Sequence, residues 1–452
     1  MKTVFFFTLG CKVNQYESEA MEKLFFAAGY ELAENVSKAD VVVVNTCAVT
    51  ALSTQKSRQM IRRFIRLNPD ALIVVIGCYA QNSPEEISQI DGVDVIIGTS
   101  ERTKIVELVE KSLANRNEKI LRVTDVENIS EFEELPHTPQ RTRAFLKIED
   151  GCNNFCSYCI IPYVRGRVRS RSLESIRVEC EELAAAGYRE IVLTGIHIGA
   201  YGCDFKNKIT LVDAIKTVLD AANPFRLRLG SIESTEMSDA LIDLMKNDSR
   251  ICNHVHLPLQ SGCDEILKAM RRPYTVKNFA ALTERLVKEI PDISIGTDLI
   301  AGFPGESDKN FDETLDFIKS QPFSKIHVFP FSSREGTVAA SMPNHVDAQI
   351  KKVRVARALE ISAAKEKTFA EKLIGKTVEI IAETEENGFI DGLTKNYVRV
   401  YVPVNPQIKS GDIIKVTAEK FIGSMLCGKV NCTEYNFKSV ELDSFRAGGK
   451  IS

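Results

Sequence analysis

A repeated alternation of apolar runs and helical patterns between residues 144 and about 335 constrains the fold of this chain more than any other feature. The apolar runs predict strands at 145–148, 191–194, 226–229, 254–257, 293–298 and 325–329, and a helical pattern follows each of the first five. A further helix is predicted near 347–372, which makes about six βα units. Because a closed barrel of this type has eight units, we expect a partial (βα)6 barrel over residues 144–372.

The first 115 residues show a second alternation of the same kind. Apolar runs at 4–8, 41–44, 72–76 and 93–97 are separated by helical patterns near 17–29, 51–67, 84–90 and 101–113. This alternation predicts a doubly wound parallel sheet with helices on its faces. Residues 116–143, which contain Pro136 and Pro139, are predicted to form a linker between this domain and the barrel.

A change of pattern after residue 373 predicts a third domain. Short apolar runs at 377–382, 398–402 and 413–418 alternate with turn dipeptides such as Asn387-Gly388 and Asp391-Gly392. Several short strands in so few residues predict a small antiparallel β-barrel over 373–437, followed by a dispensable tail at 438–452. The predicted fold class is therefore α/β, with a parallel sheet, a partial barrel and a small β-barrel in succession.

Bulk properties limit the classes of function. The 452 residues carry a net charge of −3, so any contact with nucleic acid has to come from local patches. The apolar run at 4–7 is too short for a secretory signal and no run is long enough to span a membrane, so we expect a cytoplasmic protein. In that compartment the twelve cysteines are expected to be metal ligands or buried thiols rather than disulfides.

Three cysteines, Cys152, Cys156 and Cys159, lie within eight residues of one another, after the first predicted barrel strand. Loops that follow strands build the active site in βα barrels. Thiolates hold iron–sulfur clusters, which usually take four protein ligands, so three thiolates leave one iron open. An open iron can bind S-adenosylmethionine and reduce its sulfonium, which yields a deoxyadenosyl radical. Zinc is the alternative, but it usually takes a fourth protein ligand and none is evident nearby.

Three more cysteines follow three separate strands of the N-terminal domain: Cys11 follows the first, Cys47 the second and Cys78 the third. The carboxyl ends of parallel strands share one edge of a sheet, where open α/β folds bind ligands. We therefore predict a second cluster there, with one iron free to carry sulfur; three buried core thiols are the alternative. The remaining cysteines are predicted to be structural, the least certain being those at 203 and 263: Cys180, Cys203, Cys252, Cys263, Cys427 and Cys432.

Two three-cysteine sites followed by a small β-domain resemble the radical S-adenosylmethionine methylthiotransferase family. The resemblance runs from Thr8 to about Asn431 and includes LGCKVNQYESE at 9–19, VNTC at 44–47 and IGC at 76–78. In the barrel it includes the segments 152–159, 161–167, 193–195, 256–262 and 298–306. One departure is Cys263, where the family pattern has serine.

The resemblance implies two 4Fe–4S clusters and S-adenosylmethionine as cofactors. Enzymes of this family insert sulfur into a C–H bond and methylate it; one cofactor molecule supplies the methyl group and another the radical. The family's radical-cluster positions match Cys152, Cys156 and Cys159, and its auxiliary-cluster positions match Cys11, Cys47 and Cys78. Residues that the resemblance places near S-adenosylmethionine are Tyr158, Thr194, Gly195 and Gln260.

The stretch 10–17 looks most like the branch that acts on N6-threonylcarbamoyladenosine of tRNA, whose 2-position receives the methylthio group. Three alternatives stay open at this point: another tRNA adenosine, a side chain of a ribosomal protein, and a non-catalytic iron–sulfur protein that binds RNA. The reductant and the sulfur donor are not specified by the sequence.

Two groups of residues predict contacts with RNA. Beyond the cysteine triplet, alternating arginines on an extended segment would present a rail for phosphates, or else a solvated charged strand: Arg165, Arg167, Arg169 and Arg171. The terminal domain resembles a TRAM domain, a nucleic-acid-binding β-barrel. Cations and aromatic residues there suit RNA backbone and stacked bases: Lys395, Tyr397, Arg399 and Tyr401.

Overall fold

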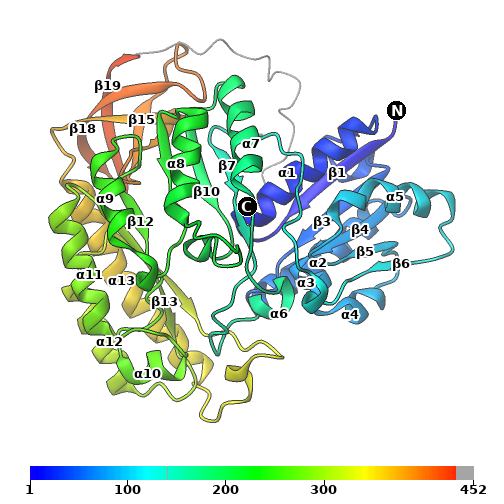
Figure 1. Cartoon of the computed structure of the whole chain (residues 1–452), viewed down its shortest axis with the longest axis horizontal. Coiled ribbons are helices and arrows are strands. Elements are labelled where there is room, and N and C mark those ends of the chain that lie inside the picture. The colour runs from blue at the N-terminus through cyan, green and yellow to red at the C-terminus, as the bar shows by residue number, and fades with distance from the viewer. Residues whose placement is uncertain (140, 434–452) are drawn as a thin grey trace.

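The computed structural model describes residues 1–139 and 141–433, in three units that follow one another along the chain (Figure 1). The predicted tail at 438–452 lies outside the described residues.

The first unit is an all-parallel sheet in the order β2-β1-β3-β4-β5-β6. Its strands are β1 (Thr3–Thr8), β2 (Glu31–Leu32), β3 (Val41–Thr46), β4 (Leu72–Gly77), β5 (Val95–Ile97) and β6 (Ile120–Arg122). The helices between them are α1 (Lys12–Ala27), α2 (Ala51–Leu67), α3 (Cys78–Asn82), α4 (Pro84–Ser88) and α5 (Ile105–Ala114).

Alternating side chains give this sheet an apolar core on each face, which confirms the doubly wound arrangement. Along β3, Val42 and Val44 enter one core while Val41 and Val43 enter the other. The predicted end of this domain at residue 115 is too early, because β6 pairs with β5 and extends the sheet to residue 122. The sequence signal for β6 is weak, since only one of its three residues is buried.

The second unit is the partial barrel, and its six parallel strands match the six predicted ones. The strands are β7 (Ala144–Lys147), β10 (Glu190–Thr194), β11 (Arg226–Arg228), β12 (His254–His256), β13 (Ser294–Ala301) and β14 (Lys325–Pro330). Bridges between β11 and β12 at Leu227–Ile251 and Ser231–His256 join two three-stranded sheets into one curved layer. The covering helices are α7 (Leu173–Ala185), α8 (Leu211–Ala222), α9 (Asp239–Asn247), α11 (Val276–Glu289), α12 (Asp308–Ser320) and α13 (Ala348–Glu371).

The third unit is a closed five-stranded barrel in the order β15-β16-β17-β19-β18. Its strands are β15 (Thr377–Glu386), β16 (Phe389–Leu393), β17 (Arg399–Pro403), β18 (Ile413–Ile422) and β19 (Met425–Thr433). The pairing is antiparallel as predicted, except that β17 and β19 pair in parallel where the barrel closes. The unit is docked on the partial barrel, because Arg226 donates hydrogen bonds to the carbonyls of Leu393 (2.9 Å) and Glu379 (2.6 Å).

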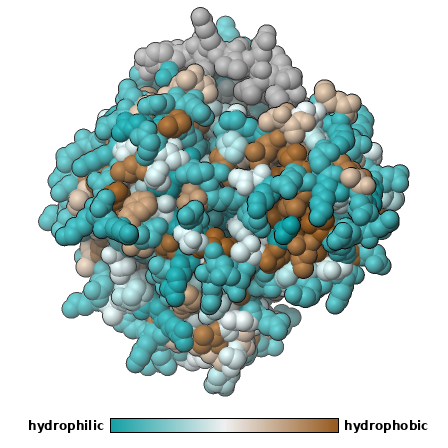
Figure 2. All heavy atoms as spheres, turned by 45° about the vertical axis from the view of Figure 1, so that its right-hand side comes forward, coloured by the Kyte–Doolittle hydropathy of each residue, from teal (hydrophilic) through white to brown (hydrophobic). Residues whose placement is uncertain are grey.

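Hydrophilic side chains cover most of the visible surface, with hydrophobic residues gathered in smaller areas (Figure 2). Among the described residues, no helix combines the length and the apolar character that a membrane crossing needs.

Candidate active site

The N-terminal thiol triplet, Cys11, Cys47 and Cys78, lies at one edge of the parallel sheet. The three residues follow β1, β3 and β4, which are neighbours in the sheet, so the three strand ends meet. Cys47 and Cys78 are buried, and burial raises the pKa of Cys78 to about 12, whereas Cys11 is exposed at the rim of the site. Buried thiols stay protonated unless a cation stabilises the thiolate, and cluster iron supplies that charge. The donor set therefore fits an iron–sulfur cluster.

A buried amide network supports this edge of the sheet. Asn14 Nδ2 donates to Asn45 Oδ1 (3.0 Å) and to the Thr46 carbonyl (3.2 Å), and Asn14 Oδ1 accepts from Cys11 Sγ (3.2 Å). Gly77, at φ +102°, precedes Cys78, and a Cβ there would lie 2.5 Å from Asn45 Oδ1. These contacts hold the backbone beside the cysteines in one conformation.

The barrel thiol triplet, Cys152, Cys156 and Cys159, lies in the loop between β8 (Glu149–Asp150) and the short helix α6 (Ile161–Arg165). Cys156 is buried and the other two are half-buried. Gly151 opens the loop at φ +89°, and a Cβ there would lie 1.9 Å from the Arg167 carbonyl oxygen. Only glycine fits at this position, so the loop is held against the segment that follows it.

Two side chains from other elements contact the sulfurs of the barrel triplet. Arg272 Nη1 donates to Cys156 Sγ (3.2 Å), and the same guanidinium pairs with Glu233. His197 Nδ1 lies 3.5 Å from Cys152 Sγ. Hydrogen bonds and positive charge at a ligand sulfur favour the thiolate and raise the reduction potential of a bound cluster. Both contacts were missed in the sequence, because they join residues far apart in the chain.

The four residues predicted to lie near S-adenosylmethionine are at the carboxyl edge of the barrel. Thr194 ends β10, Gly195 follows it, and Tyr158 is part of the thiol loop. Gln260 follows β12, donates its N–H to the Asp298 carbonyl (2.8 Å), and has a left-handed φ of +68°. Bulky residues in that conformation cluster at functional sites. Contact of these residues with the cofactor stays a prediction.

Arg165 joins the two thiol triplets. Its Nε donates to Cys78 Sγ (3.3 Å), and its Nη1 donates to Asp150 Oδ1 (3.0 Å), two residues before Cys152. Helix α6 contacts α3, and Ile160 and Val164 enter the apolar core of the N-terminal sheet (Figure 1). The segment that follows the barrel triplet therefore packs into the N-terminal domain, which carries the other triplet.

Buried charges surround this connection. Glu17 accepts hydrogen bonds from Arg165 (2.8 Å) and Lys147 (2.9 Å), and it forms an ion pair with Arg102 (3.0 Å). Burial alone would raise the pKa of Glu17, but these three cations lower it to about 2. Asp150, paired with Arg165 and Lys147, also has a pKa well below its ordinary value for the same reason. Both carboxylates are ionised at neutral pH, and Glu17 of the N-terminal domain binds Lys147 and Arg165 of the partial barrel.

The depressed pKa of Glu17 predicts a loss of stability in acid. The pKa of this carboxyl group is lower in the folded protein than its unfolded pKa of 4.5, so the ionised group stabilises the fold at pH values above 4.5. This stabilisation is lost as the pH falls toward the folded pKa of about 2. Its contribution should fall by roughly 2 kcal/mol between pH 6 and pH 3. Melting temperatures of wild type and Glu17→Gln should therefore converge over this range; a constant gap would contradict the pairing.

The prediction of an arginine rail for RNA is wrong for three of its four members. Arg165, Arg169 and Arg171 are buried, and only Arg167 is exposed. Arg171 pairs with Glu179, and Arg169 donates to the carbonyls of Arg165 (2.7 Å) and Arg167 (2.8 Å). The segment is not one extended strand but the helix α6 followed by β9 (Arg169–Ser170), and its cations satisfy buried oxygens.

The terminal barrel directs part of its predicted RNA-binding group inward. Lys395 Nζ donates to the Ser249 carbonyl (2.8 Å), and the Tyr397 ring lies 4.5 Å from the ring of His254 on β12. Arg399 pairs with Asp391. Lys395 and Tyr397 therefore belong to the junction with the partial barrel and not to an outer RNA surface.

The other cysteines form no third thiol triplet in the part of the chain that the structure describes. Cys263 Sγ donates to Glu313 Oε2 (3.1 Å), and Cys203 is exposed. Cys180, Cys252 and Cys427 are buried, while the side chain of Cys432 lies outside the described residues. Within the described ranges, no three Cys, His, Asp or Glu side chains are close enough to hold a single metal ion.

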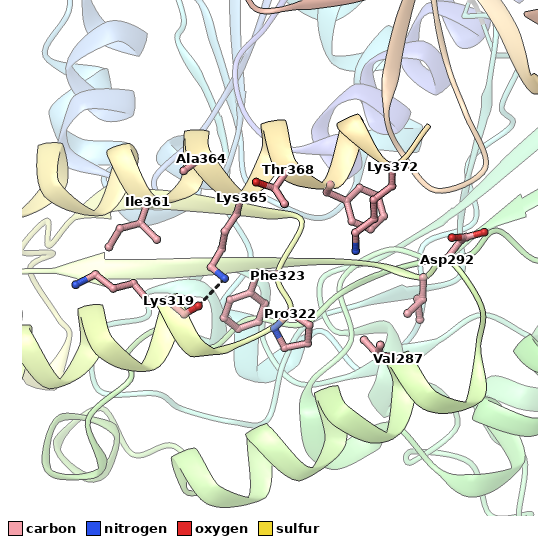
Figure 3. Close-up of a pocket in the computed structure, with 12 residues that line it drawn as sticks. Val287, Asp292, Lys319, Pro322, Phe323, Ile361, Ala364, Lys365, Thr368 and Lys372 are labelled. Carbon is pink, nitrogen blue, oxygen red and sulfur yellow. Dashed lines mark hydrogen bonds between the residues drawn. The ribbon is translucent and has the colours of Figure 1, made fainter. Parts of the chain in front are cut away.

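A groove away from both triplets lies in the outer helical layer between α11, α12 and α13 (Figure 3). Its volume is about 620 Å³. Lys365 Nζ, which points across it, donates to the carbonyls of Lys319 (2.9 Å) and Gln321 (2.6 Å) at the end of α12. The lysine thus caps the C-terminal end of α12, and none of the residues that line this groove is a cysteine.

A partial βα barrel with a three-cysteine loop and a second three-cysteine edge beside it defines a radical S-adenosylmethionine enzyme. The family model described as "Radical SAM superfamily" matches residues 146–318, and the model described as "Uncharacterized protein family UPF0004" matches residues 3–98. The solved structure of the "radical S-adenosylmethionine methyltransferase, TsrM, from Kitasatospora setae with cobalamin and 4Fe-4S cluster bound" supports the fold, with a TM-score of 0.57, 18% identity and coverage of 75% of this chain and 77% of that one.

Sequence relatives narrow this class. The "Threonylcarbamoyladenosine tRNA methylthiotransferase MtaB" of Bacillus subtilis is 45% identical over 425 residues, covering 92% of this chain and 93% of the relative. Its namesake in Aquifex aeolicus is 36% identical, over 88% and 96% of the two chains. The "tRNA-2-methylthio-N(6)-dimethylallyladenosine synthase" of Thermoanaerobacter sp. is 37% identical, over 83% and 81%. The chain belongs to the radical S-adenosylmethionine methylthiotransferase family, and its cofactors are 4Fe–4S clusters and S-adenosylmethionine.

Proposed function

We propose that this protein is a tRNA methylthiotransferase that converts N6-threonylcarbamoyladenosine to its 2-methylthio derivative. The observation that carries the proposal is the link through Arg165, which contacts Cys78 of one triplet and Asp150 beside the other. Sulfur insertion at one carbon needs a radical source and a sulfur carrier that reach the same substrate. The relatives named for threonylcarbamoyladenosine support this choice of base.

The six cysteines divide into two roles in this proposal. Cys152, Cys156 and Cys159 hold the radical cluster, and Cys11, Cys47 and Cys78 hold the auxiliary cluster. When bound, these groups and S-adenosylmethionine supply the electron, the hydrogen-abstracting radical, the sulfur and the methyl group. The chain's own side chains position the ligand loops and keep the sulfurs hydrogen-bonded, as Arg272 does at Cys156 and Arg165 at Cys78.

Mass spectrometry of tRNA nucleosides from cells with and without the gene tests the substrate. Loss of 2-methylthio-N6-threonylcarbamoyladenosine and accumulation of the unthiolated nucleoside support the proposal. If the nucleosides are unchanged, the tRNA substrate is wrong, and a methylthiolated protein side chain becomes the target of the search.

A basic face on α2 supports an RNA substrate in place of the buried arginine rail. The stretch 51–67 contains no acidic residue. Its exposed cations have no carboxylate partner among the described residues: Lys56, Arg62, Arg63 and Arg66. The N-terminal end of α2 lies beside the carboxyl edge of the partial barrel, because Ala51 N donates to Ser332 Oγ (2.8 Å), just after β14. The basic face therefore extends outward from the active-site edge, where the stem of a bound RNA would lie.

Replacing Arg62, Arg63 and Arg66 together by glutamine should weaken binding of an anticodon stem–loop irrespective of its sequence. A plot of log affinity against log salt concentration has a negative slope, and each lost phosphate contact should reduce the magnitude of that slope by about 0.9. The slope of the triple variant should therefore be smaller in magnitude by about 2–3. Fluorescence anisotropy at several salt concentrations measures this slope. Exposed Lys277, Lys288 and Lys309, on the α11 and α12 side in Figure 1, provide a control triple. Equal slopes for the two triple variants would show that α2 does not contact the RNA.

A further inference from the structure

The inner face of the partial barrel carries many polar groups. Residues of one alternation, such as Leu227, Val255 and Ile295, pack into the core beneath the helices. The opposite alternation carries charged and hydrogen-bonding groups: Glu190, Arg228, His254, His256, Asp298 and His327. A charged inner face costs folding free energy unless its groups are paired or meet a polar ligand.

Tyr397 of the terminal barrel reaches this inner face. Its ring lies 4.5 Å from the ring of His254, and the guanidinium of Arg228 lies 4.8 Å from its centroid. Arg228 also donates to the carbonyls of Lys395 (3.1 Å) and Thr394 (3.2 Å), which fastens the hairpin that carries Tyr397. The tyrosine has a left-handed φ of +65°, a costly conformation for an aromatic residue. The contacts between the terminal barrel and the partial barrel thus hold the Tyr397 ring in place and compensate for the strain of its backbone.

Cations exceed carboxylates around this tyrosine. Arg143, in the segment before β7, pairs with Glu383 (2.8 Å) and lies 3.8 Å from Glu190, and both Arg143 and Lys12 act electrostatically on Tyr397. Glu190 is already engaged by Arg228 (2.8 Å). Lys12 has no hydrogen bond or ion pair within the described residues, and it directly follows Cys11 of the N-terminal triplet.

The nearby positive charges change the acidity of the Tyr397 hydroxyl group. Burial alone would raise the pKa of Tyr397, but the charges of Lys12, Arg143 and Arg228 lower it below its ordinary value. His254 adds an unsatisfied polar atom, because its Nδ1 is buried and has no hydrogen-bond partner among the described residues. Excess positive charge and unmet hydrogen bonding together indicate a site for an anionic group.

We propose that Lys12, Arg143 and the Tyr397 hydroxyl bind the free carboxylate of the threonylcarbamoyl group on the substrate base. This inference rests on the proposed function and adds the basis of its specificity. The threonylcarbamoyl substituent ends in a carboxylate, whereas a dimethylallyl substituent carries no charge. Lys12 directly follows Cys11 of the auxiliary triplet and acts electrostatically on Tyr397, so a base whose C2 faces the auxiliary cluster would direct its N6 substituent toward this region. An RNA phosphate offers the other anion that the site would accept.

Binding measurements with synthetic anticodon stem–loops distinguish whether the site binds the threonylcarbamoyl carboxylate or an RNA phosphate. The RNAs carry threonylcarbamoyladenosine, its carboxylate methyl ester, or plain adenosine at the same position, and the cluster-loaded full-length protein is titrated by fluorescence anisotropy. Wild type should bind the free acid about 10-fold or more tightly than the ester, the range expected for a charged hydrogen bond. Lys12→Gln should lose this preference and leave binding of the other two RNAs within about 2-fold, while Lys12→Arg should keep most of it.

Each other outcome overturns the assignment. If Lys12→Gln weakens all three RNAs equally, Lys12 contacts a phosphate; if it keeps the preference for the free acid, other residues bind the carboxylate. Tyr397→Phe provides an independent variant, which should reduce the preference without changing iron content. If wild type prefers the free acid and Lys12→Gln does too, the proposed function stands and the assignment fails. If wild type binds none of the RNAs, both fail.

Discussion

Replacing Cys156 by alanine is expected to abolish formation of 5′-deoxyadenosine. Cys156 is buried within the barrel triplet, and Arg272 Nη1 donates to its sulfur (3.2 Å). With one of three thiolates missing, the loop no longer provides a complete ligand set for a cluster with one open iron. The measurement is chromatography of deoxyadenosine after chemical reduction in the presence of S-adenosylmethionine, and turnover should fall to background.

Replacing Cys47 by alanine should separate thiolation of the substrate from cleavage of S-adenosylmethionine. Thiolation should be lost while some cofactor cleavage remains, because the barrel triplet is intact. Iron content should fall from about eight to about four atoms per chain in either variant. Cys180→Ala is the matched control, since Cys180 is a residue of α7 whose side chain lies in the apolar core and belongs to neither triplet. Normal thiolation by the Cys47 variant would show that the auxiliary-cluster assignment is wrong.

Replacing Arg165 by alanine should destabilise the protein by about 3–5 kcal/mol, the cost of leaving a buried charge uncompensated. Arg165 is fully buried and pairs with both Glu17 (2.8 Å) and Asp150 (3.0 Å). Its loss removes one cation from two buried carboxylates and also the donor to Cys78. Thermal unfolding followed by circular dichroism measures the change, and the variant should melt well below wild type.

Two further variants make this expectation specific. Arg167→Ala, on the exposed neighbour of the same segment, should change stability by no more than about 0.5 kcal/mol. Arg165→Lys keeps the charge but loses the fork that reaches Glu17 and Asp150 together, so it should fall between wild type and alanine. If Arg165→Ala melts like Arg167→Ala, the domain connection does not depend on this arginine.

Local pattern was enough to predict most of the architecture. The six barrel strands, the four main strands of the N-terminal sheet and the terminal barrel appear where apolar periodicity placed them, because burial and backbone hydrogen bonding act on neighbouring residues. β6 was missed because it is short and mostly exposed. The meeting of Cys11, Cys47 and Cys78 at one edge followed from parallel strand geometry alone.

The partners of charged side chains did not follow from local pattern. The arginines after the barrel triplet look like a solvent-facing rail in the sequence, yet Arg165 pairs with Glu17, 148 residues away. Arg272 reaches Cys156 across 116 residues, and Tyr397 reaches His254 from another domain. Periodicity reports whether a side chain is buried, but not which buried group meets it.

The sequence by itself thus determined the βα order, the two thiol triplets and the family. The tertiary structure decided that Arg165 joins the two sites and that cations gather around Tyr397. The physical reason is that strands and helices arise from contacts between near neighbours, whereas buried ion pairs form wherever packing brings distant residues together out of water.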